Sequence, residues 1–143
     1  MAQPIIVFIV DDDEDDRQFL MEVIAQINPR TIFKQFNNGQ DALHALEAAE
    51  ASLPDIIFLD LNMPRLNGRQ CLQQLKENKR TSDIPVVIYT TGKKEDDMEE
   101  AQKSGSIHYI IKPTCRKDLK KEIEFVLAEI LNGSVTSVTP QRG

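Results

Sequence analysis

Three aspartates and one lysine stand at positions where they could carry out phosphoryl chemistry. Asp60 directly follows a run of four apolar residues, and Asp11 and Asp12 follow a longer apolar run. Lys112 closes a third such run. An aspartate is ionised at neutral pH, so it can attack a phosphoryl group without a general base. The chemistry then requires that the groups be positioned and that charge on the phosphoryl oxygens be neutralised.

These residues can meet if the apolar runs before them form parallel strands of one sheet. The run before Asp60 lies between Pro54 and Pro64 and shows no polar alternation, which is typical of a strand buried on both faces. The carboxyl ends of the strands in an open parallel sheet share one edge, where ligands bind. We therefore expect the acids and the lysine to converge at that edge.

Strand patterns alternate with helical patterns along the whole chain. Strands are expected at residues 4–10, 31–36, 56–59, 85–89 and 107–111. The segments between them have apolar residues at helical spacing, although residues 95–104 form only a weak, acidic helix pattern. This alternation predicts an α/β fold, a doubly wound five-stranded parallel sheet with helices on both faces. Residues 1–131 would form one domain, and residues 132–143 a flexible polar tail.

Charge repulsion at this edge indicates a metal ion. Three carboxylates about 5 Å apart would repel one another by roughly 3 kcal/mol per pair at an effective dielectric constant near 20. Mg²⁺ takes oxygen ligands and keeps several waters, so we expect it beside Asp11, Asp12 and Asp60. Lys112 would add positive charge, and Thr90, which ends the fourth predicted strand, could donate a hydrogen bond to the product.

The acidic run that begins at Asp11 has two other interpretations. Asp13 to Asp16 are typical of a solvated helix start, where the helix dipole favours negative charge, and we favour this for them. The run also has the acid spacing of a calcium loop, with Glu22 at the twelfth place. However, Asp16 stands where that loop needs glycine, and a strand precedes the run instead of a helix, so we disfavour this interpretation.

Composition limits the classes of protein. The chain has 143 residues, which suits one domain, and its net charge of −6 argues against sequence-independent binding to nucleic acid or anionic membranes. No segment resembles a signal peptide, and no apolar run approaches the roughly 20 residues of a membrane helix. Cys71 and Cys115 lack metal-type spacing and are expected to be reduced thiols. A cytoplasmic location follows as the simplest expectation.

At this point the sequence resembles a known family. It resembles the response-regulator receiver domain of two-component signalling, over about residues 4–131, in the motifs Val10-Asp11-Asp12, Leu59-Asp60-Leu61-Asn62-Met63-Pro64, Gly68, Tyr89-Thr90-Thr91 and Tyr109-Ile110-Ile111-Lys112-Pro113. The resemblance implies a flavodoxin-like fold with strand order 2-1-3-4-5.

The resemblance also implies roles for the residues of the acidic edge. Asp60 would be the phosphoacceptor. Asp12, Asp60 and the main-chain carbonyl of Asn62 would be direct Mg²⁺ ligands, and Asp11 would act through a water molecule.

Further roles follow for three residues outside the acidic loops. Thr90 and Lys112 would assist the transfer, with Lys112 as the phosphate clamp. Thr90 and Tyr109 would form the switch pair that changes conformation on phosphorylation.

Two classes of function remain open at this stage. The favoured one is a stand-alone signalling switch, without enzymatic activity on a separate substrate, that takes a phosphoryl group on Asp60 from a histidine kinase or phosphotransfer protein. It would act on an unknown downstream protein as a monomer, with dimerisation open for the phosphorylated form. The alternative is an aspartyl-phosphate phosphohydrolase, whose Asp-x-Asp motif is matched superficially by Asp11 and Asp13. A receiver that signals without phosphate is a third, less favoured, possibility.

Overall fold

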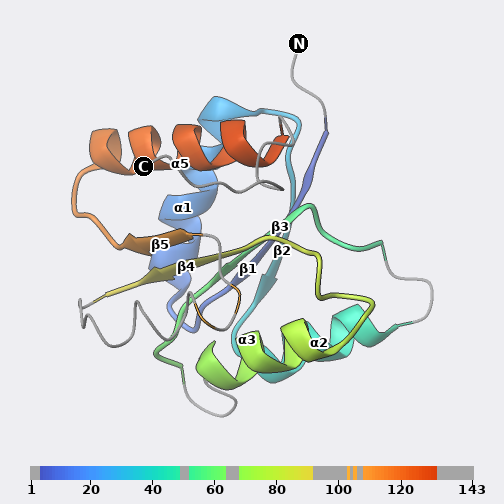
Figure 1. The fold of residues 1–143 in the computed structure, drawn as a ribbon. Coiled ribbons are helices and arrows are strands. Elements are labelled where there is room, and N and C mark those ends of the chain that lie inside the picture. Colours follow the sequence, from blue (N-terminus) through green and yellow to red (C-terminus); the bar gives the residue numbers. More distant parts are fainter. Residues whose placement is uncertain are drawn as a thin grey trace.

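A computed structural model of the chain describes residues 4–48, 52–63, 68–91, 103, 105 and 108–131. Its centre is one five-stranded sheet in the order β2-β1-β3-β4-β5, in which every neighbouring pair is parallel (Figure 1). The strands are β1 (Ile6–Val10), β2 (Ile32–Phe36), β3 (Ile56–Leu59), β4 (Val86–Thr90) and β5 (His108–Ile111). The predicted strands and their order are confirmed.

Helices cover both faces of the sheet. The described helices are α1 (Glu14–Ile27), α2 (Gly39–Glu47), α3 (Gly68–Glu77) and α5 (Arg116–Leu131). Figure 1 shows α1 and α5 on one face and α2 and α3 on the other. The helix predicted over residues 95–104 lies outside the described residues apart from Lys103, and the predicted tail over 132–143 lies outside them entirely.

The side chains of the central strands fill both layers of the core. Along β1, Val7 and Ile9 belong to the apolar cluster under α1 and α5, whereas Phe8 and Val10 belong to the cluster under α2 and α3. Successive side chains of a strand point to opposite faces, so a strand covered on both sides must be apolar throughout. The first polar residues therefore come where such strands end.

The outer strand β2 is not covered and apolar throughout as the central strands are. None of its residues is fully buried, and Ile32 is 50% exposed, as expected for a strand at the edge of a sheet. Within the part of the chain that the structure describes, no helix is long and apolar enough to cross a membrane.

Candidate functional site

Three carboxylates meet at the carboxyl edge of the sheet. Asp11 and Asp12 follow β1 and Asp60 follows β3, and these strands are neighbours in register, with Val10 opposite Leu59. The main-chain N–H of Asp60 donates to the carbonyl of Val10 at 3.0 Å, which holds the two strand ends together. One carboxylate oxygen from each of the three acids lies within 4.8 Å of the others. The structure thus brings together the acids that the sequence predicts.

This cluster suits a hard divalent cation. All three side chains offer carboxylate oxygens, the ligands that Mg²⁺ prefers. Asp11 and Asp60 are 1% and 5% exposed, whereas Asp12 is exposed, so the cluster is open to solvent on one side. Among the described residues, the buried Oδ2 atom of Asp11 has the Lys112 ammonium, 2.8 Å away, as its charged partner and accepts no further hydrogen bond. The residues present therefore fit a magnesium ion.

Lys112 lies at the centre of the charged groups. Its ammonium nitrogen is 2.8 Å from Asp11 Oδ2, 3.1 Å from Asp60 Oδ2 and 2.7 Å from Asp16 Oδ2. Its main-chain N–H donates to the carbonyl of Thr90 at 2.8 Å, which fixes the end of β5 beside that of β4.

The surroundings of Lys112 keep it charged. Burial alone would lower the pKa of Lys112, but the carboxylates of Asp11, Asp16 and Asp60 outweigh burial and hold the pKa above its ordinary value. The ammonium also lies 5.5 Å from the centroid of the Tyr89 ring, which is within cation–π range. Lys112 is therefore a fixed cation at this edge.

The surroundings of Asp11, in contrast, disfavour its charged form. Burial raises the pKa of its carboxyl to about 6, and the charge of Asp60 adds to the rise. The ion pair with Lys112 and the hydrogen bond from the main-chain N–H of Asp13 act in the other direction. Holding Asp11 ionised without a metal is consequently costly, which is the imbalance that a bound cation would relieve.

Hydrogen bonds fix the carboxylate of Asp60. Its Oδ1 accepts from the hydroxyl of Thr90 at 2.7 Å and from the main-chain N–H of Asn62 at 3.0 Å. The side-chain amide of Asn62 in turn donates to the Thr90 hydroxyl at 3.2 Å. The two oxygens of Asp60 therefore have different surroundings, with hydrogen-bond donors at Oδ1 and the Lys112 ammonium at Oδ2.

Tyr109 lies on β5 and shares a sheet face with Thr90. It pairs in register with Ile88, and Ile88 and Thr90, two residues apart on β4, point to the same face. Tyr109 is partly buried and packs against the cluster under α2 and α3. The structure places the two residues of the predicted switch pair on one side of the sheet, and their switching role stays a prediction.

One prediction for the acidic run is wrong. Asp13 fits a helix start, because it caps α1 by accepting a hydrogen bond from the main-chain N–H of Asp16 at 3.0 Å. The side chain of Asp16 is only 36% exposed and pairs with Lys112, instead of being a merely solvated acid. The reason is that Asp16 lies in the first turn of α1, close to the strand ends, where its side chain reaches Lys112.

Sequence reasoning also missed Arg17, which is buried although it is charged. Its guanidinium donates to the main-chain carbonyl of Asp11 at 2.7 Å, to Gln35 at 2.9 Å and to Asn37 at 2.9 Å, and so ties the loop after β1 to the end of β2. A signal was present, because Arg17 precedes the buried Leu20 by three residues and thus lies on the apolar face of its helix.

Gly68 positions the loop that carries Asp60. A Cβ atom at residue 68 would lie 2.3 Å from the main-chain oxygen of Asp60 and 2.4 Å from the Cα of Leu61. The main-chain N–H of Gly68 donates to the carbonyl of Leu61 at 3.2 Å. Only glycine allows the start of α3 to pack this closely on the segment after β3.

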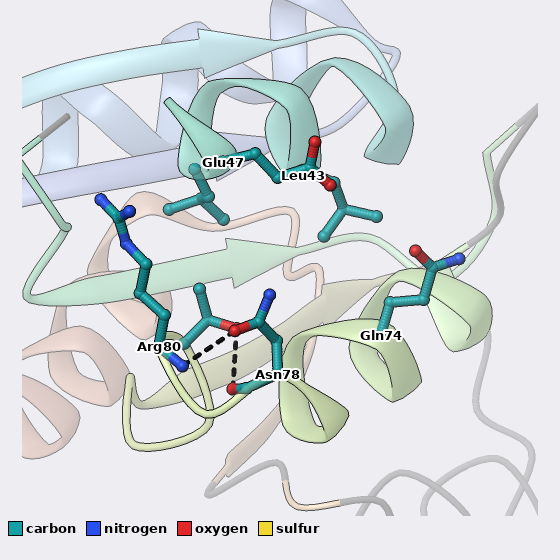
Figure 2. Close-up of a pocket in the computed structure, with 7 residues that line it drawn as sticks. Leu43, Glu47, Gln74, Asn78 and Arg80 are labelled. Atoms are coloured by element: carbon teal, nitrogen blue, oxygen red, sulfur yellow. Dashed lines mark hydrogen bonds between the residues drawn. The ribbon is translucent and has the colours of Figure 1, made fainter. Parts of the chain in front are cut away.

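A pocket of about 160 Å³ lies at the opposite edge of the sheet. Figure 2 shows Leu43 and Glu47 of α2 facing Gln74, Asn78 and Arg80, which lie on α3 or in the turn that follows it. Both helices end there, before the amino ends of β3 and β4. The pocket is therefore separate from the carboxylates.

The fold and the acidic edge together define the class of protein. A family model, the response regulator receiver domain, matches residues 7–124, so the chain belongs to the receiver family of two-component signalling. Receiver domains are signalling modules that histidine kinases or phosphotransfer proteins phosphorylate, and they bind Mg²⁺. The acidic cluster found here fits that family property.

Individual relatives resemble the whole chain. Protein PilH of Pseudomonas aeruginosa is 32% identical over 128 residues, which cover 90% of this chain and 99% of PilH. Among solved structures, the phosphorylated cyanobacterial phytochrome response regulator RcpA has a TM-score of 0.82 at 28% identity and covers 97% of this chain and 100% of its own. The Mn²⁺-bound form of response regulator Rcp1, a protein of Synechocystis, has a TM-score of 0.79 at 28% identity, with 96% and 99% covered.

Proposed function

We propose that this protein is a phosphorylation-controlled switch in which Asp60 accepts a phosphoryl group from a histidine kinase or phosphotransfer protein. In the transfer, the bond between the donor nitrogen and phosphorus breaks and a bond between an Asp60 oxygen and phosphorus forms. A Mg²⁺ ion held by Asp12, Asp60 and the Asn62 carbonyl, with Asp11 acting through water, would neutralise charge on the phosphoryl oxygens. RcpA and Rcp1 support the proposal, since one is described as phosphorylated and the other as Mn²⁺-bound.

The observation that carries the proposal is the surroundings of the Asp60 carboxylate. It is buried and ionisable, and it contacts one hydroxyl, one main-chain N–H and one ammonium, those of Thr90, Asn62 and Lys112. These three groups are donors, which is what the added phosphoryl oxygens would need. Lys112 would act as the phosphate clamp and Thr90 would follow the phosphoryl oxygens.

Movement of Thr90 would carry the signal out of the site. Its hydroxyl is bonded to Asp60 in this structure, so a phosphoryl group there would draw it to new acceptor oxygens. Tyr109, on the same face of the sheet, would turn into the space that Thr90 leaves. Shifting a conformational equilibrium from 1% to 99% takes about 5.5 kcal/mol, which a few charge-assisted hydrogen bonds of roughly 1.5–3 kcal/mol each can supply. A downstream protein would read this change by binding more tightly.

The phosphohydrolase alternative gains no support from the geometry. That class requires the two acids of its Asp-x-Asp motif to act together. Here Asp13 caps α1 through its side chain and is not one of the acids of the cluster that Asp11, Asp12 and Asp60 form.

Phosphorylation by a small donor tests the proposal. Incubation with acetyl phosphate and Mg²⁺ should add one phosphoryl group, stable in acid and labile in base, as measured by intact-mass spectrometry. Asp60→Asn should abolish the addition, whereas Asp118→Asn, which removes an exposed carboxylate from α5, should leave it unchanged. A fully phosphorylated Asp60→Asn protein would contradict the proposal.

A further inference from the structure

Asp16 makes the shortest of the three ion pairs of Lys112. Its Oδ2 lies 2.7 Å from the ammonium nitrogen, against 2.8 Å for Asp11 and 3.1 Å for Asp60. Asp11 and Asp60 reach Lys112 from strand ends, whereas Asp16 reaches it from the first turn of α1. One ammonium therefore serves three carboxylates that come from different elements.

The charge of Asp16 differs from the other two in what can neutralise it. Asp11 and Asp60 belong to the cluster that suits a divalent ion, so a bound metal would take over part of their charge. Asp16 is not a member of that cluster in the described part of the chain, and its only ion pair there is with Lys112. When Lys112 turns to a phosphoryl group, Asp16 must give up or share this counter-ion.

We propose that Asp16 competes with the phosphoryl group for Lys112 and thereby weakens phosphoryl binding at Asp60. The proposal rests on the function proposed above. Two negatively charged groups, the phosphoryl oxygens and the Asp16 carboxylate, need the same ammonium, and Asp16 already contacts it. At 36% exposure the Asp16 side chain can be hydrated when it is displaced, so it opposes phosphorylation without preventing it.

The competition affects both the equilibrium and the rate. Reaction with acetyl phosphate forms the bond from Asp60 oxygen to phosphorus and breaks the bond from phosphorus to the acetyl oxygen, and acetate leaves with the electron pair. Lys112 can neutralise charge on the transferring phosphoryl group only when its ammonium is not paired with Asp16. Removing the Asp16 charge should therefore strengthen analogue binding and speed the transfer.

Three variants separate this effect from a general change of charge. Asp16→Asn removes the competing charge. Asp15→Asn removes an equal charge from the neighbouring residue, which is exposed and is not one of the three carboxylates at Lys112. Asp16→Glu keeps the charge at residue 16. Circular dichroism would verify that all three variants are folded.

The measurements are the affinity for beryllofluoride in the presence of Mg²⁺ and the rate of phosphorylation by acetyl phosphate. Asp16→Asn should increase both by about two- to fivefold, the range expected for a partly exposed ion pair. Asp15→Asn and Asp16→Glu should stay close to the wild type.

Each other outcome is decisive. Equal effects of Asp16→Asn and Asp15→Asn, or weaker binding in Asp16→Asn, would overturn the competition. If the wild type itself neither binds beryllofluoride nor is phosphorylated, the proposed function fails. If the wild type reacts and Asp60→Asn does not, only the role of Asp16 is in question.

Discussion

Replacing Asp11 by asparagine should stabilise the metal-free protein, although it removes a carboxylate of the proposed metal site. Asp11 is 1% exposed, and among the described residues the charged partner of its Oδ2 is the Lys112 ammonium, 2.8 Å away. Burial raises the pKa of this carboxyl from 3.8 to about 6. The ionised form is therefore disfavoured by the folded protein relative to the unfolded chain.

The sign and size of the effect follow from proton linkage. The folded protein binds the Asp11 proton more tightly, so the contribution of Asp11 to stability falls as the pH rises from 3.8 to about 6 and is constant above that. At about 1.36 kcal/mol per pKa unit, the cost near neutral pH is on the order of 3 kcal/mol. This cost already includes the opposing ion pair with Lys112. Asparagine keeps an oxygen for the hydrogen bond from Asp13, so we expect a net gain of about 1–3 kcal/mol.

Urea unfolding in the presence of a chelator measures this gain. Near neutral pH, Asp11→Asn should have the larger free energy of unfolding, and the difference should vanish below pH 3.8, where both side chains are uncharged. Excess Mg²⁺ should stabilise the wild type more than the variant, because a ligand that binds only the folded state adds stability by mass action. A variant that is less stable than the wild type near neutral pH, without metal, would refute the reasoning.

Three further substitutions test other parts of the site. Asp12→Asn should weaken Mg²⁺ binding by about tenfold or more, whereas Asp13→Asn should leave it nearly unchanged, and equal losses in calorimetric titrations would contradict the assignment. Lys112→Ala should stay folded and bind Mg²⁺ at least as tightly, because an ammonium no longer competes, but be phosphorylated poorly; a wild-type rate with acetyl phosphate would exclude the clamp. Gly68→Ala should displace the segment after Asp60 and slow phosphorylation by as much as about 100-fold, and an unchanged rate would show that this close packing is dispensable.

The fold could be predicted because apolar runs and polar ends have simple physical causes. A strand covered on both faces must be apolar, as Ile56–Leu59 is, and a polar residue directly after it must lie at the sheet edge. The predicted order of the strands came from the family resemblance, because the alternation of strands and helices does not fix which strands are neighbours. The register of Val10 beside Leu59 then brings Asp11 and Asp60 together.

The contacts of Asp16 and Arg17 could not be predicted in the same way. Asp16 ends an acidic run that is typical of a helix start, and Arg17 directly follows it. Their roles depend on how the first turn of α1 faces the strand ends. That orientation fixes the short distance from Asp16 to Lys112 and buries Arg17 against the carbonyl of Asp11. Spacing in the sequence shows which side of a helix is apolar, but not which polar groups the rest of that side meets.

The measurement that tests the central claim most directly is the position of the phosphoryl group. After reaction with acetyl phosphate and Mg²⁺, borohydride reduction converts a phosphorylated aspartate to homoserine, which peptide sequencing by mass spectrometry locates. We predict homoserine at residue 60 alone. Homoserine at residue 11 or 12, with Asp60 unmodified, would contradict the account.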